Sequence, residues 1–129
     1  MHQKVLDLGI PTIFTHWCSD HRANIKAGHI EKVPQGKPGI LSFGPEVPME
    51  LQVERFGKEY ILCGNVDPPS LMTKPFDEVF ELCKKNIEVG MRAKGGYMLM
   101  CGCELPPPTP PANVYAMVKA CREYGKYSQ

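Results

Sequence analysis

The stretch Gly95-Gly96-Tyr97-Met98-Leu99-Met100-Cys101-Gly102-Cys103-Glu104-Leu105-Pro106-Pro107 decides how we interpret the fold. It is an apolar run that follows two glycines and ends in thiols and prolines, which is typical of a buried strand that leads into a loop. Thr12-Ile13-Phe14-Thr15-His16-Trp17-Cys18 has the same layout, and we predict strands at residues 12–17 and 97–101. Both runs are continuous rather than alternating, and this pattern predicts parallel strands that are buried on both faces.

Two further apolar runs, at residues 39–44 and 59–66, are also predicted strands, and amphipathic segments lie between the four runs. We predict helices at residues 1–9, 23–27, 48–57, 75–90 and 110–125. One strand and one helix repeat every 20 to 35 residues, roughly, which predicts an α/β fold with helices covering a parallel sheet. A doubly wound sheet and part of a (β/α)8 TIM barrel both satisfy this order.

Three details of the pattern concern one turn and the buried faces of two helices. Residues 67–69, Asp67-Pro68-Pro69, are predicted to form a turn after the third strand. The helix at 48–57 is predicted to bury Met49, Val53 and Phe56 because they are spaced at i, i+4 and i+7. The last helix is predicted to bury a face made of large apolar residues and one thiol: Val114, Met117, Val118 and Cys121.

The composition limits the class of protein. With 129 residues, 43% of them hydrophobic, the chain has material for one domain, residues 1–129, with a buried core. The 15 basic and 14 acidic residues nearly cancel and form no basic run, which argues against nucleic acid as a partner. No apolar run approaches the roughly 20 residues that cross a bilayer. We therefore expect a cytoplasmic protein whose six cysteines are reduced.

Soft metal ligands stand at the ends of two predicted strands. His16 and Cys18 are two residues apart, so on an extended backbone they point to the same side. Cys103 ends the other strand, and the ends of parallel strands meet at one edge of a sheet. Catalytic zinc commonly takes three protein ligands and keeps one open position, and Cys₂His is a known ligand set. The sequence therefore predicts a zinc site made of His16, Cys18 and Cys103.

The alternative for any of these thiols is simple packing, because free cysteines are among the most buried residues. We interpret Cys63, Cys83 and Cys121 in this way, since they fall on predicted core faces. Cys101 offers a second thiol on the same side as Cys103, and the spacing alone leaves the choice between these two open.

Three segments resemble the C-terminal part of the uroporphyrinogen decarboxylase superfamily, which includes the zinc-dependent corrinoid methyltransferases. They are residues 60–68, 96–114 and 116–125, and the resemblance extends back to about Pro11. The family fold is a (β/α)8 barrel, and a complete barrel needs about 250 residues. The resemblance therefore implies that residues 1–129 are the C-terminal half of a barrel, about four βα units, and are incomplete alone.

The methyltransferase branch is indicated by matching positions. That branch carries H-x-C at its fifth strand and a cysteine in a turn similar to P-G-C-G at its eighth, and His16, Cys18 and Cys103 fall on these positions. Cys101 falls where the turn commonly has proline, so the resemblance implies that Cys103 is the ligand. The chain departs from the family after Cys18, where glycine is usual. It also departs at the end of the sixth strand, where Glu46 is the nearest carboxylate and the fourth ligand stays unassigned.

The function that the resemblance implies is methyl transfer from methylcobalamin on a corrinoid protein to a small acceptor. The acceptor is a thiol similar to coenzyme M, whose pKa zinc lowers, or tetrahydrofolate. The implied partners are the corrinoid protein, the acceptor, and either a missing N-terminal half barrel or a second copy of the chain. Asn65 and Asp67 either contact substrate or fix the turn. Two alternatives are decarboxylation of a porphyrinogen, and a non-catalytic half barrel that only binds a partner.

Overall fold

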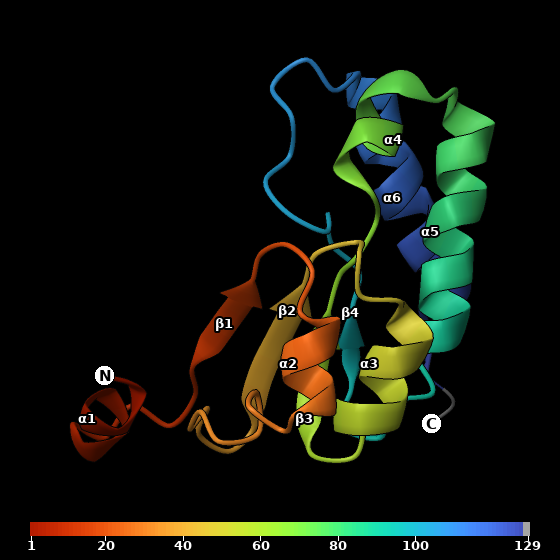
Figure 1. Cartoon of the computed structure of the whole chain (residues 1–129). Helices are drawn as coiled ribbons and strands as arrows, with labels where there is room; N and C mark the ends of the chain where they lie inside the picture. The colour runs from red at the N-terminus through yellow and green to blue at the C-terminus, as the bar shows by residue number, and fades with distance from the viewer. Residues whose placement is uncertain (128–129) are drawn as a thin grey trace.

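A computed structural model describes residues 1–127 of the chain. Its sheet has four parallel strands in the order β1-β2-β3-β4, as the prediction requires (Figure 1). The strands are β1 (Phe14–Trp17), β2 (Gly39–Phe43), β3 (Tyr60–Cys63) and β4 (Tyr97–Met98). The helices are α1 (His2–Asp7), α2 (Arg22–Lys26), α3 (Met49–Phe56), α4 (Pro68–Thr73), α5 (Phe76–Gly90) and α6 (Pro111–Tyr124).

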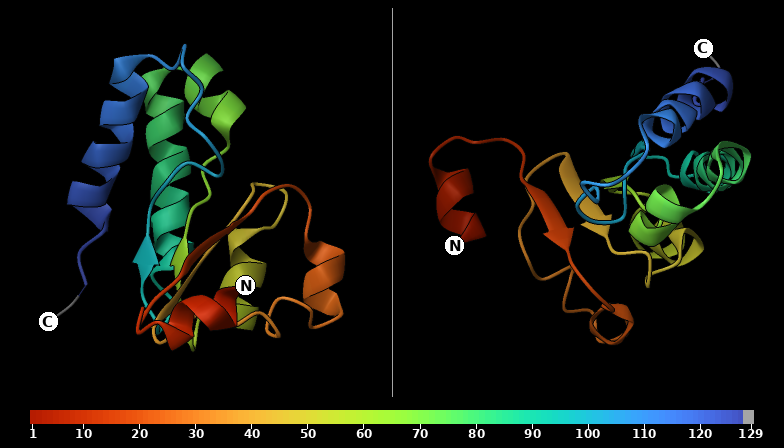
Figure 2. Two further views of the ribbon diagram at one scale, coloured as in Figure 1. Left: turned by 90° about the vertical axis from the view of Figure 1, so that its left-hand side faces the viewer. Right: turned by 90° about the horizontal axis from the view of Figure 1, so that it is seen from above.

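The core lies between the sheet and the helices on one of its faces. Leu41, Phe43 and Leu62 point from β2 and β3 into a cluster that includes Ile25 of α2 and Phe56 of α3. A second cluster joins α5 to α6, which lie side by side (Figure 2). Within residues 1–127, no helix is long and apolar enough to cross a membrane.

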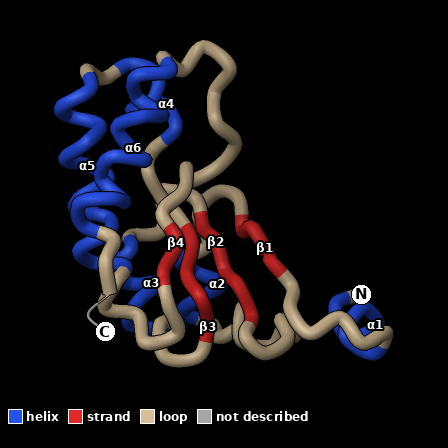
Figure 3. The backbone as a smooth tube through the Cα atoms, turned by 180° about the vertical axis from the view of Figure 1, so that it is seen from behind, coloured by secondary structure: helices blue, strands red, loops and turns tan. Residues whose placement is uncertain are grey.

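The opposite face of the sheet is open along its lower part. Phe14, Ile40 and Ile61 are register partners on this face, because side chains alternate along each strand. Phe14 is 48% exposed and Met98, on β4, is 46% exposed. Among the described elements, none lies in front of the strands when the molecule is seen from behind (Figure 3). The prediction that the strands are buried on both faces is therefore wrong for this chain, because four strands do not close around an interior.

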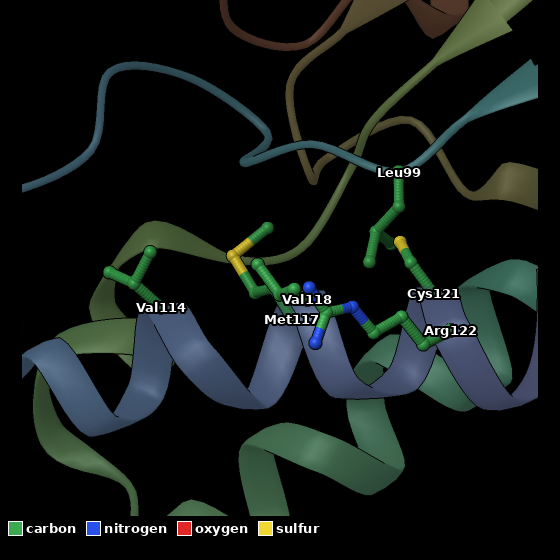
Figure 4. Close-up of a pocket in the computed structure, with 6 residues that line it drawn as sticks. All are labelled: Leu99, Val114, Met117, Val118, Cys121 and Arg122. Atoms are coloured by element: carbon green, nitrogen blue, oxygen red, sulfur yellow. The ribbon is translucent and has the colours of Figure 1, made fainter.

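Helix α6 buries its small residues most deeply. The predicted buried face is wrong in part: Val118 is 41% exposed and Cys121 is also exposed, whereas Ala116 and Ala120 are buried. The other two predicted residues, Val114 and Met117, are partly buried, and Met117 packs against the cluster between α5 and α6. Small side chains let α6 approach α5 closely, and this places Val118 and Cys121 on the other side of the helix. The outward residues line a groove of about 400 Å³ with Leu99 (Figure 4).

Three local features differ from the sequence prediction. β4 is shorter than residues 97–101, although the ladder continues beyond it, since Val66 N donates to Met100 O at 3.1 Å. The segment predicted as a turn begins α4, and Asp67 caps that helix. In α3 the amide of Gln52 is buried and donates to Val47 O at 2.9 Å, while Val53 is only partly buried.

Asn113 ties α6 to α4. Its Nδ2 donates to Leu71 O at 2.9 Å and to Lys74 O at 2.8 Å, and the residue is 3% exposed. We expect Asn113→Ala to lower the free energy of unfolding by about 1–3 kcal/mol, because buried carbonyls lose their donor. Urea denaturation measures this change. Asn86→Ala is the matched control, since Asn86 donates only within its own helix, to Leu82 O. Equal losses in the two variants would contradict the assignment.

Candidate metal site

The three predicted ligands meet above the carboxyl ends of the strands. His16 lies in β1, Cys18 follows that strand directly, and Cys103 lies in the loop after β4. One candidate ligand atom from each residue lies within 4.8 Å of the other two. The two Sγ atoms are 3.7 Å apart, although the residues are separated by 85 positions. Two sulfurs bound tetrahedrally to one zinc at about 2.3 Å lie about 3.8 Å apart.

The backbone on each side explains this approach. After Cys18 the chain turns at Ser19, whose φ of 71° lies in the left-handed region that favours glycine. On the other side, Gly102 passes close to two neighbours. A Cβ there would lie 3.0 Å from Cδ of Pro45 and 3.2 Å from O of Asn65. A side chain at this position would therefore have to displace its neighbours by a few tenths of an ångström, and glycine avoids this.

Cys101 is not part of this group. Its side chain is 8% exposed and belongs to the core cluster between α5 and α6. Its Sγ donates to the carbonyl of Glu104 at 3.7 Å, and burial raises the pKa of the thiol. The bend at Gly102 breaks the strand alternation that would have put Cys101 beside Cys103. The structure thus brings Cys103, and not Cys101, to His16 and Cys18.

The imidazole of His16 has one nitrogen in use and one unused. Nδ1 lies 3.0 Å from Oγ of Ser42 on β2. Nε2 is buried and has no hydrogen-bond partner among residues 1–127. A buried polar atom without a partner is uncommon in folded proteins, and a bound ion is one of its ordinary explanations. This nitrogen and the paired sulfurs therefore fit a zinc ion.

Electrostatics around Cys18 also favour a cation. The hydrogen bond and the charge of Cys103 raise the pKa of the Cys18 thiol above its ordinary value, and Glu46 adds to this effect. The cause is that neighbouring negative charges oppose a second thiolate at the same point. A bound dication would lower the pKa of the thiol instead, because its positive charge stabilises the thiolates.

A cleft of about 250 Å³ opens beside the thiols. Its lining includes both thiols together with the carboxylates of Glu46 and Asp67, and no lysine or arginine of residues 1–127 lines it. Oδ2 of Asp67 accepts from Ser70 N at 2.9 Å and from Ser70 Oγ at 2.7 Å, as an N-cap of α4. Asp67 therefore both starts a helix and faces the cleft.

Asn65 has a different position from the one that we expected. It is 7% exposed, and its Nδ2 donates to Val47 O at 2.8 Å and to Gly44 O at 3.2 Å. These bonds hold the loop that carries Glu46, and Asn65 is absent from the lining of the cleft beside the thiols. A contact between Asn65 and substrate stays a prediction, whereas its contact with the loop is observed.

The remaining thiols lie away from the cleft. Burial raises the pKa of Cys63 to about 11 and that of Cys83 to about 12, as expected for packing residues. Sequence reasoning missed Ser42, because a serine within an apolar strand carries no motif. Its place opposite His16 follows only from the strand register.

Comparisons with known proteins agree with this architecture. The model of one family, described as uroporphyrinogen decarboxylase (URO-D), matches residues 6–124. A methyltransferase from Methanosarcina mazei with a solved structure superposes with a TM-score of 0.72 and 25% sequence identity. The alignment covers 88% of this chain and 31% of that methyltransferase, so the chain spans about a third of its length. No curated protein matches the sequence. The predicted fold class, part of a (β/α)8 barrel, is confirmed.

The ligand set makes a direct prediction about metal content. We expect the chain to bind one zinc ion. We expect Cys103→Ser to weaken zinc binding by more than about 100-fold, because loss of a residue that only hydrogen-bonds to a metal ligand already costs about 10–100-fold. Competition with a chromophoric chelator measures this affinity. Cys121→Ser is the control, because that thiol lies on the outer face of α6. Unchanged affinity in Cys103→Ser would exclude this site.

Zinc affinity is also expected to depend on pH. The pKa of the Cys18 thiol is raised, so the thiol carries its proton at neutral pH and must release it when a metal binds. Affinity therefore increases with pH, by about tenfold per unit for each proton released, until the pH passes the pKa. Calorimetry in two buffers of different ionisation enthalpy counts the protons. A pH-independent affinity would show that Cys18 is not a ligand.

Proposed function

The chain belongs to the uroporphyrinogen decarboxylase family, whose model it matches over residues 6–124, and we propose that it is the metal-binding part of a methyltransferase. The observation that carries the proposal is the meeting of His16, Cys18 and Cys103 at the strand ends. The likeness to the Methanosarcina mazei methyltransferase supports the same reaction class.

In this proposal zinc is held by the two thiolates and by Nε2 of His16. When bound, it supplies a Lewis acid that lowers the pKa of an acceptor thiol at its open position. The cleft of about 250 Å³ beside the thiols has room for a small acceptor. Glu46 lines that cleft, so its carboxylate is placed to take the proton that the acceptor loses. Asp67 lies on the same wall and is the candidate contact for the rest of the acceptor.

The methyl donor in this proposal is methylcobalamin on a separate corrinoid protein, and the acceptor is a thiol similar to coenzyme M or tetrahydrofolate. Because no lysine or arginine of the described residues lines the cleft, a cation that recognises an acidic acceptor has to come from elsewhere. The rest of the barrel is the natural source of such a group.

We also propose that the open surfaces of the chain receive the remainder of the barrel, from a missing N-terminal half or from a second copy. Phe14 at one edge of the sheet and Met98 at the other are each about half exposed. The groove that Leu99 lines with the outer residues of α6 is a second open apolar surface. Large apolar surfaces of this kind are normally covered in a working protein.

The family description favours a second candidate, decarboxylation of a porphyrinogen. That reaction needs no metal ligand, so it gives no role to the orphaned Nε2 of His16 or to the paired thiols. The presence or absence of stoichiometric zinc separates the two candidates.

The open position of the metal is tested by thiol binding. We expect cobalt-loaded protein to gain sulfur-to-cobalt charge-transfer absorption when mercaptoethanesulfonate is added, because the thiolate enters the coordination sphere. Ethanesulfonate, which lacks the thiol, is the control ligand and is expected to leave the spectrum unchanged. If the thiol produces no new absorption in metal-loaded protein, a thiol acceptor is excluded and tetrahydrofolate is the acceptor that the proposal retains.

A further inference from the structure

Ser42 is the polar partner of the imidazole at the metal site. Its Oγ lies 3.0 Å from Nδ1 of His16, and the residue is fully buried near the carboxyl end of β2. The contact is built into the sheet, because the parallel register places His16 directly opposite Ser42. Neither residue depends on a loop for this approach, so the hydroxyl has a fixed position relative to the ring.

The Ser42 hydroxyl beside Nδ1 and the lack of an acceptor beside Nε2 together decide which ring nitrogen carries the proton. In a neutral imidazole one nitrogen is a donor and the other an acceptor. With the proton on Nδ1, the ring donates to Oγ of Ser42 and leaves a lone pair on Nε2. With the proton on Nε2, the N–H is buried and finds no acceptor among residues 1–127. A buried donor without an acceptor costs free energy, so the first tautomer is favoured.

We propose that Ser42 is a positioning residue for metal binding: it holds the His16 ring with the Nε2 lone pair directed toward the sulfurs of Cys18 and Cys103. This inference rests on the proposed function, because the proposed function supplies the metal that the ring nitrogen binds. Ser42 acts through His16 and touches neither the metal nor the acceptor. Partners of this kind fix the tautomer and orientation of metal-binding histidines, and their loss weakens binding by about 10–100-fold.

A purely structural role for Ser42 makes different predictions. The neighbouring residues Leu41 and Phe43 point to the opposite face of the sheet and carry the core packing there. Ser42→Ala removes only an oxygen atom, and Ser42→Thr keeps the hydroxyl and adds a methyl group. If the side chain only fills space, alanine is therefore tolerated better than threonine. If the hydroxyl orients the ring, the order is reversed for metal affinity.

The experiment measures zinc affinity and the histidine tautomer in the wild-type chain and in three variants. We expect Ser42→Ala to bind zinc about 10–100-fold more weakly and Ser42→Thr to recover most of this loss. Thr15→Val is the matched control, because that hydroxyl lies next to His16 in β1 but donates to Oε1 of Gln35 at 2.6 Å. Its zinc affinity is expected to equal that of the wild type.

The second readout needs no metal. Nitrogen-15 shifts of the metal-free imidazole distinguish the two tautomers, and we expect the Nδ1–H form in the wild type and a mixture in Ser42→Ala. Wild-type affinity in Ser42→Ala, weak binding in Ser42→Thr, or an Nε2–H ring in the wild type would each overturn the proposal. If the wild-type chain binds no zinc at all, the metal site itself is wrong, whereas normal wild-type binding with an unaffected Ser42→Ala removes only the role of Ser42.

Discussion

The common direction of the four strands is the constraint on which the rest of the structure depends. Parallel pairing places every carboxyl end at one edge of the sheet, so the residues that follow β1 and β4 reach the same region although they are 85 positions apart. The loops that follow β1 and β4 therefore have only a short distance to span. The left-handed turn at Ser19 and the close passage of Gly102 are the local conditions that let the two sulfurs approach to 3.7 Å.

Most elements of the fold could be predicted from periodic features of the sequence. Glycine-bounded apolar runs gave the strands, and proline at helix starts gave α5 and α6. Hydropathy did not predict the buried face of α6 correctly. It ranks Val118 above Ala116 for burial and takes no account of the distance between two packed helices. Close contact with α5 selects the small residue, and the larger one is left on a surface that this chain does not cover. Sequence alone cannot tell whether an apolar face meets the same chain or another.

Some residues of the candidate site could be predicted from a sequence pattern, whereas others are recognised only in the structure. Soft ligands at strand ends singled out His16, Cys18 and Cys103, and the structure brings these residues together. The side-chain amides of Asn65 and Asn113 donate to backbone carbonyls of segments distant in the sequence, and no spacing rule predicts such hydrogen bonds. The position of a buried carbonyl is a property of the folded chain, so the side chain that serves it is recognised only after folding is known.

The long sequence separation of the ligands has a consequence for biosynthesis. His16 and Cys18 leave the ribosome before Cys103, which follows β4 and lies 85 positions further along the chain than Cys18. A nascent chain that ends before this strand holds two ligands and lacks the third. The three side chains therefore come together only after β4 has been synthesised and has paired with β3. A metal that needs all three as ligands can be bound only from that stage of folding onward.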